Sequence, residues 1–99
     1  MIKQVIWSPL SENDLETILA YLHKNWNRQV VNRFIDKIEN LIEQIANNPK
    51  QFPLINKKRK VRKCVITKHN TIFYREYKGT VELLRIFDNR QNPRKRKYE

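Results

Sequence analysis

Arginine is the residue of this sequence best suited to chemistry, and it gathers in the second half of the chain. A guanidinium group offers phosphate oxygens a planar fork of donors, which lysine does not. Three arginines in or directly after strand-like segments could present such forks on the open face of one sheet: Arg62, Arg75 and Arg90. Aromatic residues that can stack on bases lie between these charges: Phe73, Tyr74, Tyr77 and Tyr98. The pattern indicates a surface that binds phosphates and bases, with a solvated charged face and a core role for half of the aromatics as alternatives.

The net positive charge of the chain is confined to its second half. The 99 residues carry a formal net charge of +11, yet basic and acidic residues balance in residues 1–56. The excess is densest at the C-terminus, in a basic tail after the last predicted strand: Arg90, Arg94, Lys95, Arg96 and Lys97. We expect one electropositive face, whose natural partners are RNA, DNA or an acidic protein. A tail that only confers solubility is the alternative.

Other kinds of catalytic or metal site find little support in the sequence. One cysteine and two widely separated histidines, His23 and His69, do not provide the ligand spacing of a zinc site, so we expect no metal. With a single glycine there is no glycine-rich phosphate loop, and no cofactor is expected. Ser8 and Ser11 are typical of turn and cap positions, and Cys64 lacks a histidine close enough to activate it. His69 is suited to proton transfer, although a turn histidine is more often inert.

Hydrophobic periodicity predicts the elements that must position these side chains. Residues 1–7 indicate a short strand, and apolar residues at helical spacing predict helices over about 11–25 and 31–45, the first with Ser11 and Asp14 as a capping box. Three further segments have the composition of strands: 60–66, 71–77 and 80–87. Lys78 and Gly79 join the last two as a hairpin loop. The order β-α-α-β-β-β predicts an α+β fold, with a helical hairpin on one face of an antiparallel meander and the other face partly open.

Size and composition predict one small domain. We expect the whole chain, 1–99, to form it, and the sequence leaves open whether the basic tail, residues 91–99, is flexible. No stretch is long and apolar enough to span a membrane, and the first 25 residues do not resemble a signal peptide, so we expect a cytoplasmic protein without membrane contact. Cys64 cannot form an internal disulfide and is expected to be a buried small hydrophobe.

Alternation along the predicted strands assigns the basic residues to faces. Arg62 should share a face with Lys60 and Cys64. Arg85 should lie on the face of its strand that holds three apolar residues: Val81, Leu83 and Phe87. It would then be a partly buried structural arginine, and two carboxylates are candidates for its partner: Glu76 and Asp88. A target-binding role for Arg85 is equally open.

Several segments, taken in order, form a recognisable series. They are "VIWSPLSENDLETILAYL", "NNPKQFP", "KVRKCVI" and "HNTIFYREYKGTVELLRIFDNRQNPRK". The series covers nearly the whole chain and resembles the RelE/ParE superfamily, the toxins of bacterial type II toxin-antitoxin modules. The fold that this resemblance implies is the one predicted above from periodicity.

The resemblance implies a growth-inhibiting toxin that a cognate antitoxin neutralises. In the RelE branch such toxins cut messenger RNA on the ribosome, and in the ParE branch they inhibit DNA gyrase; the sequence favours neither branch clearly, so enzymatic activity stays open. A nucleic-acid-binding module without toxicity is a third alternative.

The resemblance also implies roles for individual residues. If the chain cuts RNA, its catalytic residues would be Arg62, Arg90 and Tyr98, while Thr71 stands where RNA-cutting members are expected to have a further arginine. Other basic residues would contact the target or nucleic acid: Lys60, Arg75, Arg85, Arg94, Lys95, Arg96 and Lys97.

Overall fold

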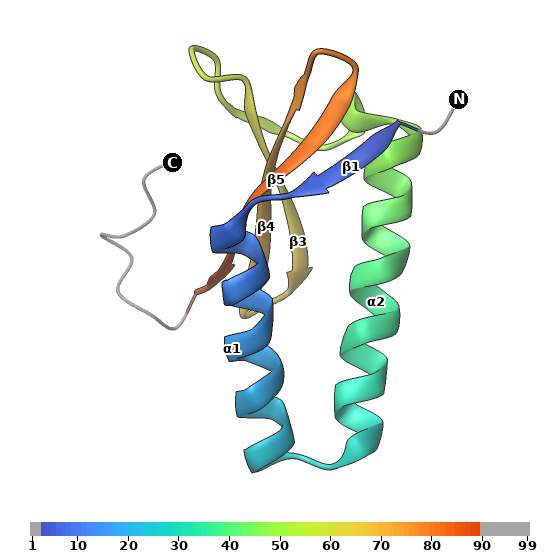
Figure 1. Cartoon of the computed structure of the whole chain (residues 1–99), viewed down its shortest axis with the longest axis vertical. Coiled ribbons are helices and arrows are strands. Elements are labelled where there is room, and N and C mark those ends of the chain that lie inside the picture. The colour runs from blue at the N-terminus through green and yellow to red at the C-terminus, as the bar shows by residue number, and fades with distance from the viewer. Residues whose placement is uncertain (1–2, 90–99) are drawn as a thin grey trace.

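The computed structural model describes residues 3–89 of the chain. Its elements are β1 (Gln4–Trp7), α1 (Pro9–Asn25), α2 (Arg28–Asn47), the short 3-10 helix η1 (Pro49–Gln51), β2 (Leu54–Asn56), β3 (Val61–Thr67), β4 (Asn70–Tyr77) and β5 (Thr80–Asp88). The two helices run side by side, joined by a short loop, and project beyond the sheet at that end (Figure 1). The α+β fold with a helical hairpin against a sheet is therefore confirmed.

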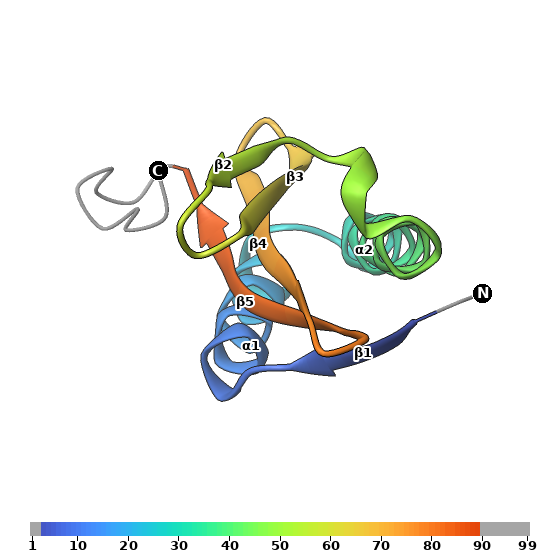
Figure 2. The same cartoon turned by 90° about the horizontal axis from the view of Figure 1, so that it is seen from above.

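The sheet is mixed, with strand order β1-β5-β4-β3-β2 (Figure 2). The predicted meander is correct for β3, β4 and β5, which pair antiparallel. The prediction of a wholly antiparallel sheet is wrong for β1, which lies parallel to β5 with Gln4 opposite Thr80 and Trp7 opposite Leu83. A parallel pair needs a long crossover, and the intervening helices and strands provide it. Strand β2, which was not predicted, extends the sheet beside the start of β3.

Helix α1 begins two residues earlier than the sequence suggested. Ser8 is the N-cap, because its Oγ accepts a hydrogen bond from the backbone N–H of Ser11 at 3.0 Å. The Ser11 hydroxyl donates in return to the carbonyl oxygen of Ser8 at 2.8 Å. Pro9 occupies the first helical position, where its missing N–H costs nothing. The predicted capping box of Ser11 and Asp14 is therefore wrong, and the Asp14 carboxylate serves another purpose.

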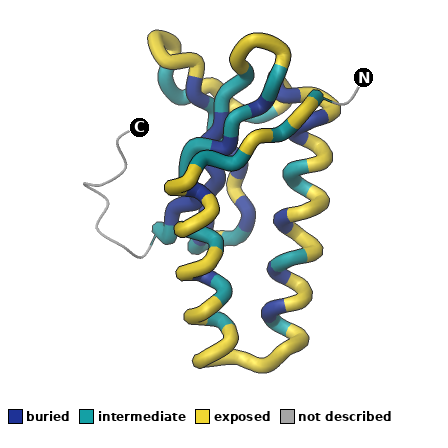
Figure 3. Tube along the Cα trace, viewed as in Figure 1, coloured by how far each residue is buried: buried dark blue, intermediate teal, exposed yellow. Residues whose placement is uncertain are grey.

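Helix α2 contributes much of the main core. Asn27 caps it by accepting from the backbone N–H of Val30 at 3.0 Å, and its buried side chains include Phe34, Ile38 and Ile45. These positions follow one side of the helix (Figure 3) and pack against the helix-facing side of β3, β4 and β5. Within residues 3–89, no helix has the length and apolar character that crossing a membrane requires.

The sheet face away from the helices holds a second, smaller core. Val61, Phe73 and Phe87 are buried there, with the rings of Phe73 and Phe87 edge to face at 6.1 Å. A bulge in β5 shifts the register, so that Leu83 lies opposite Tyr74 whereas Arg85 lies opposite Phe73. Arg85 consequently shares this face with Phe87 but not with Val81 and Leu83 as predicted, because simple alternation cannot anticipate the extra residue.

Tyr74 joins the sheet to the segment that follows α2. Its side chain is fully buried, and its hydroxyl donates to the carbonyl oxygen of Pro49 in η1 at 2.6 Å. The ring of Phe52 packs edge to face against it at 6.4 Å. This single hydrogen bond gives a buried backbone acceptor its partner and fixes η1 against the central strand.

Replacing Tyr74 by phenylalanine should therefore destabilise the protein by about 1–2 kcal/mol, because the Pro49 carbonyl would stay buried without a donor. Urea denaturation followed by circular dichroism measures the difference in free energy of unfolding. Tyr77→Phe is the matched control, since Tyr77 is 47% exposed, and should cost less than about 0.5 kcal/mol. Equal effects of the two substitutions would contradict this role of Tyr74.

Candidate functional site

Arg62 lies on the helix-facing side of β3 and holds backbone carbonyl groups of the η1 segment. Its Nη1 donates to the carbonyl oxygen of Phe52 at 2.8 Å and to that of Lys50 at 3.2 Å. With the bond from Tyr74 to Pro49, three carbonyl groups of this segment are tied to β3 and β4. The predicted catalytic arginine is thus part of the scaffold.

Arg75 lies on the opposite face of the sheet. Arg75 on β4 lies opposite Val61 on β3, whereas Arg62 on β3 lies opposite Tyr74 on β4. Since neighbouring residues of a strand point to opposite faces, the two arginines lie on opposite sides of the sheet. The Nε of Arg75 donates to Glu82 at 2.9 Å, and its Cζ lies 4.9 Å from the centre of the Tyr77 ring. The prediction that Arg62 and Arg75 share the open face is wrong, and Arg90 lies outside the described residues.

Lys60 belongs to the turn between β2 and β3, so its predicted place on a strand face beside Arg62 is wrong. Residues 57–60, here called the basic turn, are four consecutive cations: Lys57, Lys58, Arg59 and Lys60. The Asn56 side chain accepts from the backbone N–H of Arg59 at 2.9 Å, which orders the turn. Lys60 has a φ of 58°, a left-handed conformation that costs a residue with a Cβ on the order of 1 kcal/mol.

A hollow of about 410 Å³ lies between η1, β2 and the basic turn. It is lined by Lys50, Leu54, Lys57, Lys60, Arg62 and Glu76, and is here called the basic hollow. Glu76 forms an ion pair with Lys3 at 3.0 Å, and Arg62 is bonded to carbonyl groups. Lys50, Lys57 and Lys60 have no ion pair within residues 3–89. The hollow can hold an anion, because three uncompensated ammonium groups line it.

Arg85 is a structural arginine, as one of the two predictions had it, but its partner is Asp14 of α1. The carboxylate accepts from Arg85 Nε at 2.8 Å and from Nη2 at 2.9 Å, and also from the backbone N–H of Ile86 at 2.9 Å. Of the two expected partners, Glu76 pairs with Lys3 instead. Asp14 thus supplies a hydrogen-bond acceptor to the part of β5 that lies beyond the end of β1.

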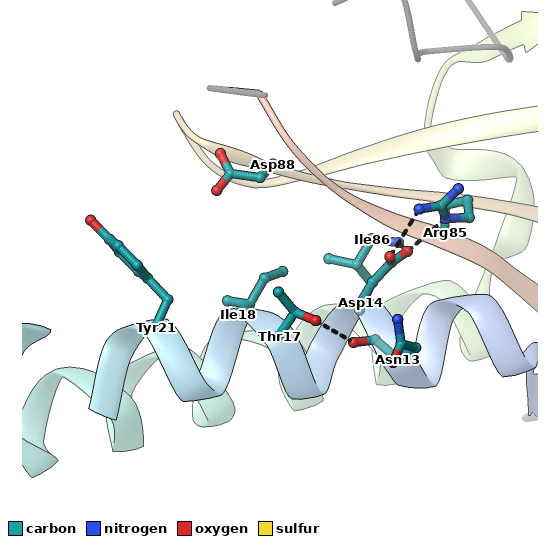
Figure 4. Close-up of a pocket in the computed structure, with 8 residues that line it drawn as sticks. All are labelled: Asn13, Asp14, Thr17, Ile18, Tyr21, Arg85, Ile86 and Asp88. Carbon is teal, nitrogen blue, oxygen red and sulfur yellow. Dashed lines mark hydrogen bonds and ion pairs between the residues drawn. The ribbon is translucent and has the colours of Figure 1, made fainter. Parts of the chain in front are cut away.

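The Asp14 contact lies at one end of a pocket of about 340 Å³ between α1 and β5 (Figure 4). Its lining residues come from both elements: Asn13, Asp14, Thr17, Ile18, Tyr21, Arg85, Ile86 and Asp88. The Asp14 and Arg85 side chains meet at one end of it, and the Tyr21 side chain lies at the other end. The Asp14–Arg85 ion pair, here called the clamp, therefore joins the helix and the strand that form the pocket.

The predicted stacking aromatics divide between core and surface. Phe73 and Tyr74 are fully buried, which leaves Tyr77 as an exposed ring with Arg75 on it and the Lys78 ammonium 5.3 Å from its centre. Burial raises the pKa of the Tyr74 hydroxyl, so this group stays protonated. Tyr98 lies outside the described residues. Of the four predicted stacking aromatics, Tyr77 is the one that the structure describes as exposed.

The other polar candidates have structural or surface positions. Cys64 is fully buried, as predicted, and burial raises the pKa of its thiol to about 11, which makes it a poor nucleophile. His23 is exposed on α1. His69 lies in the β3–β4 turn, where its backbone N–H donates to the Thr67 hydroxyl at 3.1 Å. Within residues 3–89, no group of three or more His, Cys, Asp or Glu side chains is placed to hold a metal ion.

Sequence reasoning missed two sets of residues at these sites. Asp14 was assigned to a helix cap, and only its contact with Arg85, 71 residues away, shows its role. Lys50 and Lys57 were counted only in the charge total, although the run at 57–60 was a usable signal for the basic turn. The tail residues with predicted roles lie outside the described residues: Arg94, Lys95, Arg96 and Lys97.

Comparison with known proteins places this fold in a family. Residues 5–93 match the family described as ParE toxin of type II toxin-antitoxin system, parDE. The chain therefore belongs to the ParE toxin family, within the RelE/ParE superfamily that the sequence resembles. A comparison with curated proteins returns no match.

Three solved structures resemble the chain at low sequence identity and support the fold alone. The chromosomal ParDE toxin-antitoxin system from P. aeruginosa matches with a TM-score of 0.74 and 13% identity, covering 88% of this chain and 96% of that chain. The E. coli DinJ-YafQ toxin-antitoxin complex matches with a TM-score of 0.60 and 10% identity, covering 89% and 93%. A copper-bound mutant toxin from Helicobacter pylori matches with a TM-score of 0.52 and 18% identity, covering 88% and 94%.

Replacing Asp14 by asparagine should lower the free energy of unfolding by about 2 kcal/mol, since the mostly buried carboxylate holds both a guanidinium group and a backbone N–H. Chemical denaturation measures the loss. Asp36→Asn, an exposed position on α2, removes the same charge and should have an effect within about 0.5 kcal/mol of zero. A loss no greater than that of the control would show that the clamp contributes little.

The raised pKa of Cys64 should make stability fall with pH in alkaline solution. The thiol ionises near pH 9.0 in the unfolded chain and near pH 11 in the folded one. Between these values the unfolded state gains a charge that the folded state excludes, so about 2–3 kcal/mol of stability should be lost. Denaturation at several pH values from 8 to 11 measures this slope, and Cys64→Ala should reduce the total loss of stability over this range by about 2–3 kcal/mol. An unchanged slope would contradict the burial of the thiol.

Proposed function

We propose that this ParE-family toxin stops growth by inhibiting DNA gyrase, as its resemblance to the ParE branch implies. The observation that carries the proposal is that Arg62 binds backbone carbonyl groups of the η1 segment. Cleavage of RNA through the ribose 2′-hydroxyl requires a base, an acid and cationic groups that converge on one phosphate. Arg62 and Tyr74 instead donate to carbonyl groups of η1, and Arg75 lies on the other face of the sheet.

The residues proposed to contact the target are the basic ones on the surface. They are Lys60, Arg75 and Arg85 in the described part of the chain, and Arg94, Lys95, Arg96 and Lys97 in the tail. Arg75 and Arg85 each have a carboxylate partner, Glu82 and Asp14, which holds the guanidinium group in place while side-chain exposures of 36% and 32% leave part of it accessible. Their guanidinium groups would therefore contact the target in a fixed orientation.

The proposed partner in the cell is a cognate antitoxin in the cytoplasm. Two of the similar structures come from toxin-antitoxin assemblies, the ParDE system and the DinJ-YafQ complex. Exposed apolar side chains on β1 and α1 would give such a partner apolar surface to bury: Ile6, Leu10 and Tyr21. An antitoxin that combined apolar with acidic residues would match both these side chains and the basic half of the chain.

A second candidate function is cleavage of messenger RNA on the ribosome. The observation that favours it is the basic turn, whose four cations suit ribosomal RNA. The predicted residues Arg90 and Tyr98 would then supply the chemistry together with the phosphate-binding groups. This alternative requires Arg62 to exchange its carbonyl partners for a phosphate.

Two assays in parallel separate the candidates. The purified full-length chain should inhibit supercoiling by gyrase and leave a defined messenger uncut on programmed ribosomes, as primer extension would show. Arg90→Ala is examined in both assays, and Arg33→Gln, a charge removed from the exposed face of α2, is the control. A discrete cut in the messenger that disappears with Arg90→Ala, without an effect on gyrase, would replace the gyrase proposal by the ribonuclease one.

A further inference from the structure

The basic turn lies at an end of the sheet where two hairpins project, the β2–β3 turn and the β4–β5 turn (Figure 1). Four like charges in one short turn repel one another, which opposes the close approach that the turn requires. The turn is nevertheless ordered by the hydrogen bond from Arg59 to Asn56. A binding partner of opposite charge would remove the repulsion.

Lys60 adds a second observation at the same place. Its φ of 58° lies in the left-handed region, where glycine or asparagine is the usual residue. The other left-handed residue with a Cβ within residues 3–89 is Lys78, whose conformation the two-residue hairpin demands. At Lys60 the backbone conformation places a charged side chain at the basic hollow. The turn thus keeps a lysine at a position that favours glycine and that lines a cavity.

The acidic groups near the basic turn do not neutralise it. Glu76 pairs with Lys3, and Glu82 pairs with Arg75. Lys50, Lys57 and Lys60 therefore line the basic hollow with their charges unmatched by any carboxylate within residues 3–89. Their three ammonium groups come from η1 and from the two ends of the turn, so a single anionic group in the hollow would lie between these two elements.

We propose that the basic turn and Lys50 form a binding site for the phosphodiester backbone of a nucleic acid. Phosphates fit because they are bound by charge alone, and the hollow offers one apolar side chain, Leu54, beside its charged groups. A protein partner would need an apolar centre with few charges. The four turn residues include no aromatic side chain, so the site contacts the backbone without reading bases. The proposed site is compatible with either target, DNA gyrase or the ribosome.

The test measures binding of the full-length chain to a short DNA duplex and to an RNA duplex of the same sequence, by fluorescence anisotropy across a salt series. Lys57→Gln with Lys60→Gln should weaken binding about tenfold at low salt and reduce the slope of log affinity against log salt by about two, one for each lost phosphate contact. Arg33→Gln with Lys37→Gln removes equal charge from α2 and should leave the slope unchanged.

The two duplexes identify the source of the phosphate. An equal loss on DNA and RNA supports a site that binds either backbone, and a loss on one of them alone supports the site and names the nucleic acid it serves. Equal slope changes from the turn pair and the α2 pair would overturn the proposal, because binding would then follow net charge. It would also be overturned if polyglutamate bound as tightly as the duplexes and lost affinity equally with the turn pair, since the site would then recognise carboxylates.

Lys60→Gly provides a variant that should fold at least as well as the parent, because glycine adopts the left-handed conformation without steric cost. Its melting temperature should be unchanged or higher, while its affinity for the duplexes should fall several-fold. Retained affinity in a protein of unchanged melting temperature would show that Lys60 is not part of the site.

Discussion

The alternation of side chains along β3 and β4 decides where the cations of this protein can act. Neighbouring residues on these strands point to opposite faces, so Arg62 and Arg75 are separated by the sheet although their strands are paired. On the helix side, Arg62 donates hydrogen bonds to carbonyl groups of the η1 segment. These groups need donors because η1 is too short to satisfy them internally. On the other side, Arg75 is held by Glu82 and lies on the Tyr77 ring. The same strand geometry thus makes one arginine structural and the other a surface group.

The mixed sheet leaves part of β5 without a neighbouring strand, and Asp14 takes the place of that strand. Strand β1 ends at Trp7, opposite Leu83, so the last part of β5 loses its neighbouring strand on that side. The Asp14 carboxylate accepts from the backbone N–H of Ile86 where a strand would have done so, and the same two oxygens bind Arg85. Ser8 continues the connection by donating its hydroxyl to the carbonyl oxygen of Leu84 at 2.8 Å. The start of α1 is therefore joined to β5 by hydrogen bonds in place of a strand.

Local pattern was enough to predict the helices, the three long strands and the hairpin at Lys78 and Gly79, whose φ values of 50° and 79° fit a two-residue turn. The parallel pairing of β1 could not be predicted, because it joins residues more than seventy positions apart and leaves no local signal. The face on which Arg85 lies could not be predicted either, because the bulge in β5 adds one residue and so reverses every later face assignment.

The candidate site was less predictable than the fold. Arg62 was expected to face a target because its strand is basic, but its partners are backbone carbonyls, which have no sequence signature. Lys60 was placed on a strand that begins one residue later, so its turn position and left-handed backbone were missed. The order of motifs along the chain did indicate the family, because it samples several elements at once and survives errors in any one of them.

The gyrase proposal depends most on the structural role of Arg62, which holds the η1 segment and does not bind a target. Nuclear magnetic resonance of the arginine side chains tests it directly, by measuring the exchange of the guanidinium protons with water before and after a nucleic-acid duplex is added. Protons of Arg62 should exchange slowly both before and after the duplex is added, while the signals of Arg59, the arginine of the basic turn, should shift. Rapid exchange at Arg62, or a shift of its signals larger than that of Arg59, would contradict the scaffold role.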